Sequence, residues 1–280
     1  MERPDSSAEP LRDPGRIHAF WCRIPSRPNF GDALTPWLIQ RIAGRYPVFV
    51  QAEDPRPKYL VVGSVLEYAG ARTTVWGSGI ITRTDHVSPA ATLLAVRGPL
   101  SRRRAPECGV ECPEVFGDPA LLLPRFYTPK ATVRHGIGIV AHYSDKPRLA
   151  GRWPRSAGLR LIDIQDPLES VIDQIASCHV IASSSLHGLI ASHAYGVPAL
   201  WVKFRDLPHG DDSKFLDYYL SLGQEPPEAH RLDEAHVDIA DILRRVPPAP
   251  RLPDLDALWL ACPFAAEPKS RSAAGSRPEP

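Results

Sequence analysis

The sequence contains no apolar stretch that reaches the ~18 residues needed to cross a lipid bilayer. Its first residues, 1–14, are polar and include no apolar signal core, so we predict a cytoplasmic protein and not an exported one. The formal net charge is also small, at +1. Because the overall charge does not favour nucleic acid or an acidic membrane surface, any attraction for an anionic ligand must be local, and we predict no nucleic-acid partner.

Cysteine is scarce and odd in number, with five residues in a chain of 280. A chain of this length can bury a sizeable core without disulfides, so we predict free thiols in a reducing compartment. Cys108 and Cys112 have the separation of zinc ligands, but no second Cys or His pair follows at a suitable distance. We therefore predict no metal site.

Several sequence signatures of common enzymes are also missing. There is no Walker-type phosphate loop and no serine nucleophile elbow. The glycines of Gly77-Ser78-Gly79 do not have the spacing of a dinucleotide fingerprint. The chemistry must therefore come from a less common set of residues.

Proline is abundant, with 31 residues, many of them near the ends of the chain. The terminal segments 1–15 and 263–280 lack apolar periodicity, and we predict that both are disordered tails. Between them, short β-branched runs alternate with amphipathic segments. We predict strands at 16–22, 59–63, 74–79, 92–96, 136–142, 160–164, 178–182 and 198–202, and helices at 33–42, 167–177, 186–195 and 232–245. This alternation predicts an α/β fold of two Rossmann-like domains with parallel sheets, 16–129 and 130–262, facing a cleft.

The segment 177–198 carries the strongest signal for a binding site. A buried strand ends near Ala182, and Ser184 or Ser185 is a natural N-cap for a helix that starts at Leu186. The free N–H groups of such a helix end accommodate phosphate or carboxylate. His187 lies in the first turn, where it suits acid–base work, and Gly188 would let a ligand approach the backbone. A capped core helix with an incidental histidine is the alternative interpretation.

A second candidate segment is Asn29-Phe30-Gly31-Asp32, which follows the first predicted strand. Gly31 frees the backbone, while Asn29 and Asp32 offer polar side chains at the start of the next helix. The alternative is that Asp32 only caps that helix. The position at the carboxyl end of a strand favours a functional role.

A third candidate is Arg97, which follows the strand at 92–96 and precedes Pro99 in the first turn of a helix. An arginine there can bind a carboxylate or phosphate in a bidentate manner. Gly77, Ser78 and Asp118 are expected to shape the cleft, although a plain turn would also explain Asp118.

In this order, the segments resemble the polysaccharide pyruvyl transferase family over about residues 16–203. The matching pieces are Asn29-Phe30-Gly31-Asp32, Gly77-Ser78-Gly79, Arg97-Gly98-Pro99-Leu100-Ser101, Gly117-Asp118-Pro119, Ser184-Ser185-Leu186-His187-Gly188 and Gly196-Val197-Pro198. The resemblance implies a fold like the two-domain GT-B glycosyltransferases and phosphoenolpyruvate as co-substrate, with no other cofactor. It also implies a saccharide or lipid-linked oligosaccharide acceptor, whose hydroxyl pair receives pyruvate as a cyclic ketal in exopolysaccharide biosynthesis.

The resemblance assigns roles to the candidate residues. His187 would contact the donor and perform acid–base catalysis, and Asp32 would activate the acceptor. Arg97 and the helix start at Ser184, Ser185, Leu186 and Gly188 would hold the donor, with Arg97 opposite His187 across the cleft. Asn29, Gly31, Gly77, Ser78 and Asp118 would line the acceptor side or the cleft.

One departure from the family pattern concerns the donor. Family members often carry arginine two residues before the motif histidine, where this chain has Ser185. Arg97, Lys203 or Arg205 would then have to supply the positive charge.

Two other functions fit the same residues. A GT-B glycosyltransferase could hold the diphosphate of a nucleotide sugar at the same helix end, although residues 189–195 contain no carboxylate to hold the sugar. A non-catalytic saccharide-binding homologue is the third interpretation. With a lipid-linked acceptor, peripheral contact with the inner face of the membrane is compatible with a chain that does not cross it.

Overall fold

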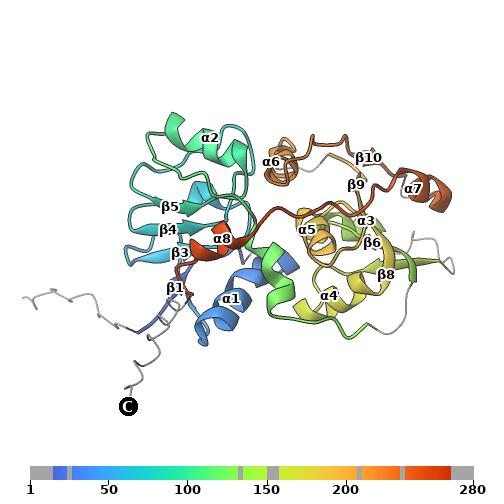
Figure 1. Cartoon of the computed structure of the whole chain (residues 1–280), viewed down its shortest axis with the longest axis horizontal. Helices are drawn as coiled ribbons and strands as arrows, with labels where there is room; N and C mark the ends of the chain where they lie inside the picture. The colour runs from blue at the N-terminus through green and yellow to red at the C-terminus, as the bar shows by residue number, and fades with distance from the viewer. Residues whose placement is uncertain are drawn as a thin grey trace, which may run out of the picture.

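The computed structural model describes residues 15–23, 27–131, 135–149, 158–206, 210–233 and 237–265. The predicted terminal tails, 1–15 and 263–280, lie almost entirely outside these residues. Two five-stranded sheets form the framework, and every strand pair in them is parallel (Figure 1). Helices pack on the sheets, so the predicted α/β fold with two parallel sheets is confirmed.

Both sheets have the same topology. The first contains β1 (His18–Ala19), β2 (Val48–Phe49), β3 (Lys58–Leu60), β4 (Thr73–Trp76) and β5 (Thr92–Ala95), in the order β2-β1-β3-β4-β5. The second contains β6 (His135–Val140), β7 (Leu159–Ile162), β8 (Cys178–Ser183), β9 (Ala199–Lys203) and β10 (His230–Arg231), in the order β10-β9-β8-β6-β7. Counted along the chain, each order is 2-1-3-4-5, which places a switch point between the first and third strands of each sheet.

Helices lie between and after the strands along the chain. They are α1 (Phe30–Ala43), α2 (Pro99–Glu107), α3 (Lys146–Leu149), α4 (Leu168–Ala176), α5 (Leu186–Ala194), α6 (Ser213–Ser221), α7 (Ile239–Arg245) and α8 (Asp256–Leu260). Three short 3₁₀ segments add to them: η1 (Leu66–Tyr68), η2 (Pro119–Arg125) and η3 (Tyr143–Asp145). No helix in the described part of the chain is long and apolar enough to span a membrane.

Local chemistry accounts for the helix boundaries. The first helix begins at Phe30, three residues earlier than predicted, because Asn29 is its N-cap and accepts a hydrogen bond from the Asp32 N–H at 3.2 Å. The same helix ends at Gly44, which adopts a left-handed φ of 72°. Pro99 occupies the first turn of α2, as predicted. Asp32 is therefore not the capping residue, which leaves its carboxylate available for another role.

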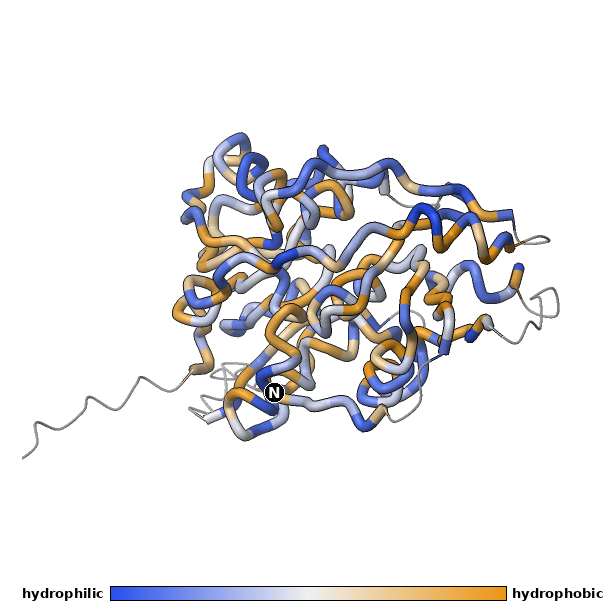
Figure 2. Tube along the Cα trace, turned by 45° about the vertical axis from the view of Figure 1, so that its right-hand side comes forward, coloured by the Kyte–Doolittle hydropathy of each residue, from blue (hydrophilic) through white to orange (hydrophobic). Residues whose placement is uncertain are grey.

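One apolar core joins the two halves of the molecule. A single cluster of buried residues runs from Ala19 and Trp76 of the first sheet to Ile181 and Ile190 beside the second. The segment η2 links the sheets and packs against α5. Figure 2 shows the hydrophobic segments mainly in the interior of the trace and the hydrophilic ones along outer turns. The halves are consequently in firm contact.

The C-terminal region differs most from the prediction. The helix expected over 232–245 covers only Ile239–Arg245, and Leu232 is instead buried beside β10, where its N–H donates to the carbonyl of Lys203. Beyond α7 the chain returns to the first sheet (Figure 1), where the carbonyl of Leu258 on α8 accepts a hydrogen bond from the indole of Trp76 at 2.8 Å. The unpredicted helix α8 therefore covers part of the first sheet.

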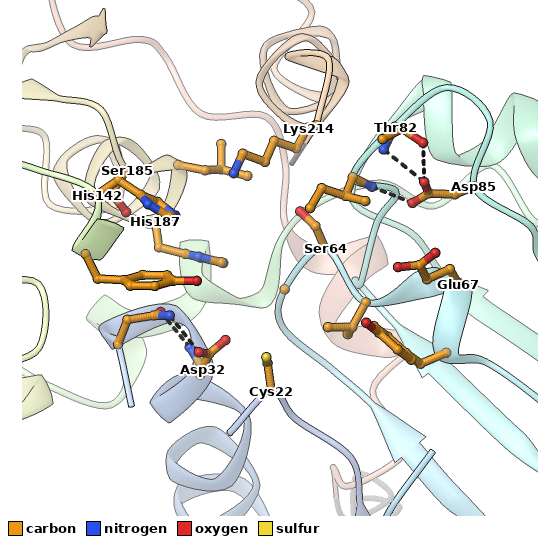
Figure 3. Close-up of a pocket in the computed structure, with 18 of the residues that line it drawn as sticks. Cys22, Asp32, Ser64, Glu67, Thr82, Asp85, His142, Ser185, His187 and Lys214 are labelled. Carbon is orange, nitrogen blue, oxygen red and sulfur yellow. Dashed lines mark hydrogen bonds between the residues drawn. The ribbon is translucent and has the colours of Figure 1, made fainter. Parts of the chain in front are cut away.

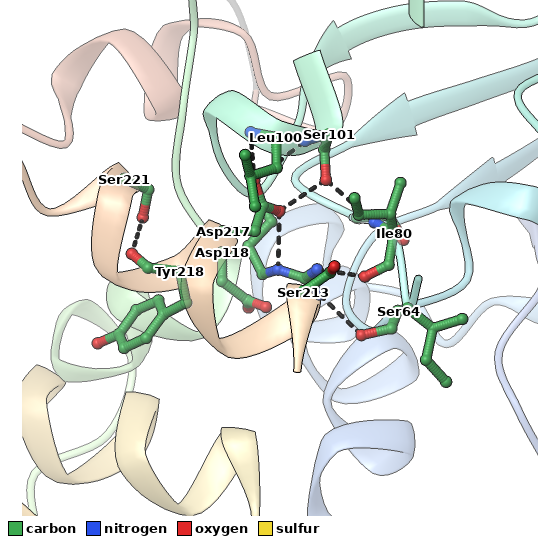
Figure 4. A network of polar contacts seen from close by, with 12 residues as sticks. Ser64, Ile80, Leu100, Ser101, Asp118, Ser213, Asp217, Tyr218 and Ser221 are labelled. Carbon is green, nitrogen blue, oxygen red and sulfur yellow. Dashed lines mark hydrogen bonds and ion pairs between the residues drawn. The ribbon is translucent and has the colours of Figure 1, made fainter. Parts of the chain in front are cut away.

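A buried carboxylate fastens α6 to the first half of the molecule. Asp217 on α6 accepts hydrogen bonds from the backbone N–H groups of Leu100 (2.9 Å) and Ser101 (3.0 Å) and from the Ser101 hydroxyl (2.6 Å). It also accepts from Nε of Arg97 at 3.2 Å, and both side chains are 0% exposed (Figure 4). A Cβ on Gly98 would lie 2.0 Å from the carbonyl oxygen of Asp217, so glycine permits this close approach. We call this arrangement the Asp217 clamp.

We predict that Asp217→Ala lowers the free energy of unfolding by about 3–5 kcal/mol, because it leaves the buried guanidinium of Arg97 without its counter-charge. Urea denaturation followed by circular dichroism measures the change. The matched control is Asp206→Ala, which removes ion pairs of an exposed carboxylate with Arg231 and Lys203 and should lower the free energy of unfolding far less. An equally small loss for both variants would show that the Asp217 clamp adds nothing to stability.

Candidate functional site

A cavity of about 950 Å³ lies at the carboxyl ends of strands from both sheets. Loops after β1 and β3 form one wall and loops after β6 and β8 form the other, so the cavity lies at both switch points, where ligands of parallel α/β sheets bind. Its lining includes Cys22, Asn29, Asp32, Ser64, Glu67, Tyr68, Asp85, His142, Tyr143, Ser185, Leu186, His187 and Lys214 (Figure 3). Two segments predicted from the sequence, at 29–32 and 184–188, therefore meet in one place.

His187 occupies the first turn of α5 and reaches into the cavity with a side chain that is 13% exposed. Its Nε2 lies 3.5 Å from Oδ2 of Asp118, which is fully buried. Neither atom has a hydrogen-bond partner in the described part of the chain. The Asp118 carboxylate thus stands behind the imidazole, and a proton on Nε2 would point toward it.

Gly31 brings α1 against the same imidazole. A Cβ at this position would lie 2.1 Å from Nδ1 of His187, so only glycine permits the observed contact. We predicted that Gly31 frees the backbone. The structure gives a different reason for glycine at this position: it makes room for a side chain of the other wall. Its neighbour Asp32 consequently faces the cavity near His187 (Figure 3).

Burial raises the pKa of Asp32 to about 7, while the hydrogen bond from Nδ2 of Asn29 to its Oδ2 (2.6 Å) acts in the opposite direction. A carboxyl group with this pKa is present in both protonation states at neutral pH, which suits an acid or a base. His142 on the opposite wall is different, because burial and the charges of Lys214, Arg205 and His187 lower its pKa to about 3. We therefore expect His142 to stay neutral.

The sequence model of polysaccharide pyruvyl transferases matches residues 7–203, which include every segment of the cavity except the start of α6 and Gly210. The chain belongs to the polysaccharide pyruvyl transferase family.

Two relatives of this family member each align with 70% of the chain. One is the uncharacterized protein L143 of Acanthamoeba polyphaga mimivirus, which is 29% identical over 208 residues and is covered over 72% of its length. The other is the succinoglycan biosynthesis protein ExoV of Rhizobium meliloti (strain 1021), which is 30% identical over 211 residues. The aligned part of the chain spans 62% of ExoV.

The structure corrects the interpretation of Arg97. Its side chain is 0% exposed and does not line the cavity. Besides Asp217, the guanidinium donates to the Ser64 hydroxyl at 2.8 Å and to the carbonyl of Ile80. Because its donors are directed at protein acceptors, Arg97 does not face His187 across the cavity, and the prediction that it contacts the donor is wrong for this structure.

Several other predicted site residues have structural contacts. Ser184 accepts a hydrogen bond from the N–H of His142 (2.9 Å) and donates one to Asp145 (3.1 Å). A Cβ on Gly188 would lie 2.4 Å from the hydroxyl of Ser183, so this glycine serves packing inside the protein. Of the predicted N-cap candidates, Ser185 takes that position, and no side-chain hydrogen bond accompanies it.

The residues expected to shape the cleft lie beneath it. The hydroxyl of the fully buried Ser78 donates to the carbonyl of Gly63 at 2.8 Å. Gly77 has a φ of 88°, and a Cβ there would lie 2.2 Å from Pro119. Asp118 caps η2 by accepting from the N–H of Ala120 with its other carboxylate oxygen. These residues hold the segment that carries Asp118 under His187.

The residues predicted to substitute for the missing arginine are paired with carboxylates and do not line the cavity. Arg205 donates to Asp145 at 3.0 Å, and Lys203 pairs with Asp212. Neither lines the cavity. Lys214, on the unpredicted helix α6, does line it. The lining residues that the motifs did not indicate also include Cys22, Ser64, Glu67, Tyr68, Asp85, His142 and Tyr143. Among the described residues, no cluster of three or more His, Cys, Asp or Glu side chains could hold a metal ion.

We predict that Asp32→Asn changes how stability depends on pH. The folded-state pKa of Asp32, about 7, lies above the ordinary value of 3.8. The wild-type protein therefore loses stability as pH rises from about 4 to about 7, because folding keeps a proton that the unfolded chain releases. The variant should gain a few kcal/mol relative to wild type above this window, since each pKa unit corresponds to about 1.4 kcal/mol.

Thermal unfolding of both proteins across this pH range tests the prediction. The two midpoints should be similar at the acidic end, where the Asp32 carboxyl group is neutral. A constant difference between wild type and Asp32→Asn at every pH would contradict a raised pKa for Asp32.

We also predict that Gly31→Ala displaces the imidazole of His187, because the added methyl group and Nδ1 cannot both keep their positions. The readout is the NMR signal of the His187 ring, assigned by its absence from a His187→Ala spectrum. Gly70→Ala is the matched control, since a Cβ at Gly70 meets nothing within 4 Å. A ring signal that is equally unperturbed in both variants would show that the contact is looser than the structure indicates.

Proposed function

We propose that this protein transfers a pyruvyl group from phosphoenolpyruvate to a pair of hydroxyl groups on a saccharide, forming a cyclic ketal. The observation that carries this proposal is the meeting of two acid–base groups in one cavity: His187, backed by Asp118, and the buried Asp32. Membership in the polysaccharide pyruvyl transferase family supports it. So does the likeness to ExoV, whose name refers to succinoglycan biosynthesis.

The wall formed by the second sheet suits an anionic donor. The helix α5 begins at Leu186 with backbone N–H groups that have no partner within the helix, and this end carries a partial positive charge. Ser185, Leu186 and His187 line the cavity there. A carboxylate or phosphate of phosphoenolpyruvate bound at this point would place the reacting carbons beside the imidazole.

The first half of the reaction requires an acid and a base. His187 donates a proton to the methylene carbon of phosphoenolpyruvate, which makes the adjacent C2 electrophilic. One saccharide hydroxyl then forms a C–O bond to C2 and releases its proton to Asp32. The donor's own carboxylate stabilises the positive charge that develops at C2, while the helix N-terminus stabilises the negative charge of the phosphate that leaves.

The second half closes the ketal. The bond between C2 and the phosphate oxygen breaks, the second hydroxyl adds to C2, and its proton leaves with phosphate. A proton passing from Asp32 to His187 restores the starting state, so the protons balance without another reagent. The contact of Gly31 with His187 keeps the helix that carries Asp32 next to the imidazole, which suits this transfer.

The wall formed by the first sheet suits a saccharide. Tyr68 is 43% exposed, and Glu67 and Ser64 line the same side of the cavity. Aromatic faces pack against sugar rings, and carboxylate and hydroxyl oxygens accept and donate hydrogen bonds with sugar hydroxyls. The acceptor in this proposal is an exopolysaccharide repeat or its lipid-linked precursor, the latter met by peripheral contact with the inner face of the membrane. The paired sheets and the cavity between them support a GT-B-like arrangement with domains near 16–129 and 130–262, except that α8 at the end of the second range packs on the first sheet.

The proposal is tested by incubating the purified full chain with phosphoenolpyruvate and a panel of saccharides. The expected product carries the mass of pyruvic acid less one water, and one phosphate is released for each product molecule. His187→Ala should lower the rate by about 10²–10⁴-fold, the range for loss of a general acid or base. The control is His179→Ala, since His179 is an exposed residue of β8 outside the cavity. Full activity in His187→Ala would remove the role assigned to that residue.

A further inference from the structure

Lys214 is distinguished by its position. It is the second residue of α6, and it is the only lysine or arginine among the described residues that line the cavity. Figure 3 shows its side chain extending from α6 toward the wall that carries Ser185 and His142. Every other charged side chain of the lining is an aspartate or a glutamate, or a histidine. Among the lining residues, positive potential on this wall therefore comes from Lys214 and from the helix end of α5.

Lys214 is also the cation in this region that lacks a counter-ion. Arg97 is neutralised by Asp217, Arg205 by Asp145 and Lys203 by Asp212. Within the described part of the chain, no carboxylate forms an ion pair with Lys214, and no hydrogen bond from its ammonium is found. Its nearest aromatic contact is with its own neighbour Phe215, whose ring centroid lies 5.3 Å from Nζ. A largely buried ammonium without a carboxylate is costly unless an anion joins it.

The site beside Lys214 has room for such an anion. Ser185, the N-cap of α5, has a short side chain that makes no capping hydrogen bond. A ligand at that helix end would therefore meet backbone N–H groups on one side and the Lys214 ammonium on the other.

We propose that Lys214 binds the anionic donor directly, as the charged partner of the carboxylate or phosphate of phosphoenolpyruvate. This role rests on the function proposed above. It assigns to α6 the charge that the serine at position 185 does not supply. The same residue then contributes to specificity, because a neutral saccharide gains nothing from the ammonium, whereas an anion does.

The Asp217 clamp positions this lysine. Asp217 is three residues beyond Lys214 on α6 and accepts three hydrogen bonds from the start of α2 and one from Arg97. At the other end, the backbone N–H of Phe215 donates to the carbonyl of Asp212, which adopts a left-handed φ of 67°. Arg97 therefore serves the donor indirectly: it is a positioning residue that fixes the helix on which Lys214 stands.

The charges around Lys214 make its protonation sensitive to pH. Burial and the nearby Arg97 lower its pKa to about 8, and Asp212 and Asp145 act in the opposite direction. From the wall of the second sheet, His142 faces it as a neutral ring. His187 and Asp32 also line the cavity, and burial raises the pKa of Asp32 to about 7. The ammonium is present below about pH 8 and is lost above it, so donor affinity should fall as pH rises through this value.

Three proteins test the proposal. Lys214→Met keeps the bulk and removes the charge, and Lys214→Arg keeps the charge. Lys130→Met is the control, since Lys130 is exposed and does not line the cavity. The measurements are the KM for phosphoenolpyruvate and the thermal stabilisation that phosphoenolpyruvate produces. We expect Lys214→Met to raise the KM about 10- to 100-fold, the range for loss of one charged hydrogen bond. Lys214→Arg should retain most of the affinity, and Lys130→Met should match wild type.

The pH profile provides a second readout that a purely structural role would not change. Between about pH 7 and about pH 9, the KM of wild type should rise more than that of Lys214→Arg, because arginine stays protonated. A wild-type KM in folded Lys214→Met would overturn the role of Lys214 while leaving the proposed function in place. A wild-type protein that phosphoenolpyruvate neither stabilises nor serves as a substrate would overturn both.

Discussion

The contact between Gly31 of α1 and the imidazole of His187 of α5 is the constraint on which the site depends. The helix α1 follows a strand of the first sheet, and α5 follows a strand of the second. The contact therefore fixes how close the two halves come. It places Asp32 on one side of the imidazole, while Asp118 lies behind it. A side chain at position 31 would separate these groups, and the acid–base pair would no longer share one volume. The geometry of the site is therefore a property of the interface between the sheets and not of either sheet alone.

The cavity has two electrically different walls. The second sheet contributes a helix N-terminus and Lys214, and the first contributes the carboxylates Asp32, Glu67 and Asp85. This difference in charge gives a physical reason for two substrates of different charge to bind at different walls. An anion is attracted to one wall and repelled by the other, while a neutral polyhydroxyl compound can use the carboxylates as hydrogen-bond acceptors. Such a division fits a transferase that must hold donor and acceptor face to face.

Much of this arrangement follows from the sequence, because parallel strands leave clear signals. β-branched runs located β3, β4, β6 and β8, and polar residues directly after β1 and β8 indicated the cavity. The sequence could not show the fate of Arg97, since its partner Asp217 lies 120 residues away on a helix that was not expected. The sequence also could not show that Lys214 lines the cavity, since this residue stands on the same helix. The buried Phe215, Tyr218 and Tyr219 of α6 have helical spacing, so a local signal for this helix exists, but only tertiary contacts bring its start to the cavity. The two-residue strands β2 and β10 are likewise too short to produce a periodic signal.

The return of the chain to the first sheet through α8 has a mechanical meaning. The polypeptide crosses between the sheets near η2 and crosses back before α8, where Leu258 is bonded to Trp76 and Phe264 packs on Tyr59 with ring centroids 4.7 Å apart. The chain therefore connects the two halves of the molecule twice. A relative rotation of the halves would have to strain both connecting segments and would also disrupt the buried core that the halves share. The spacing of the two cavity walls is thus set by the whole interface between the sheets and not by a single linker.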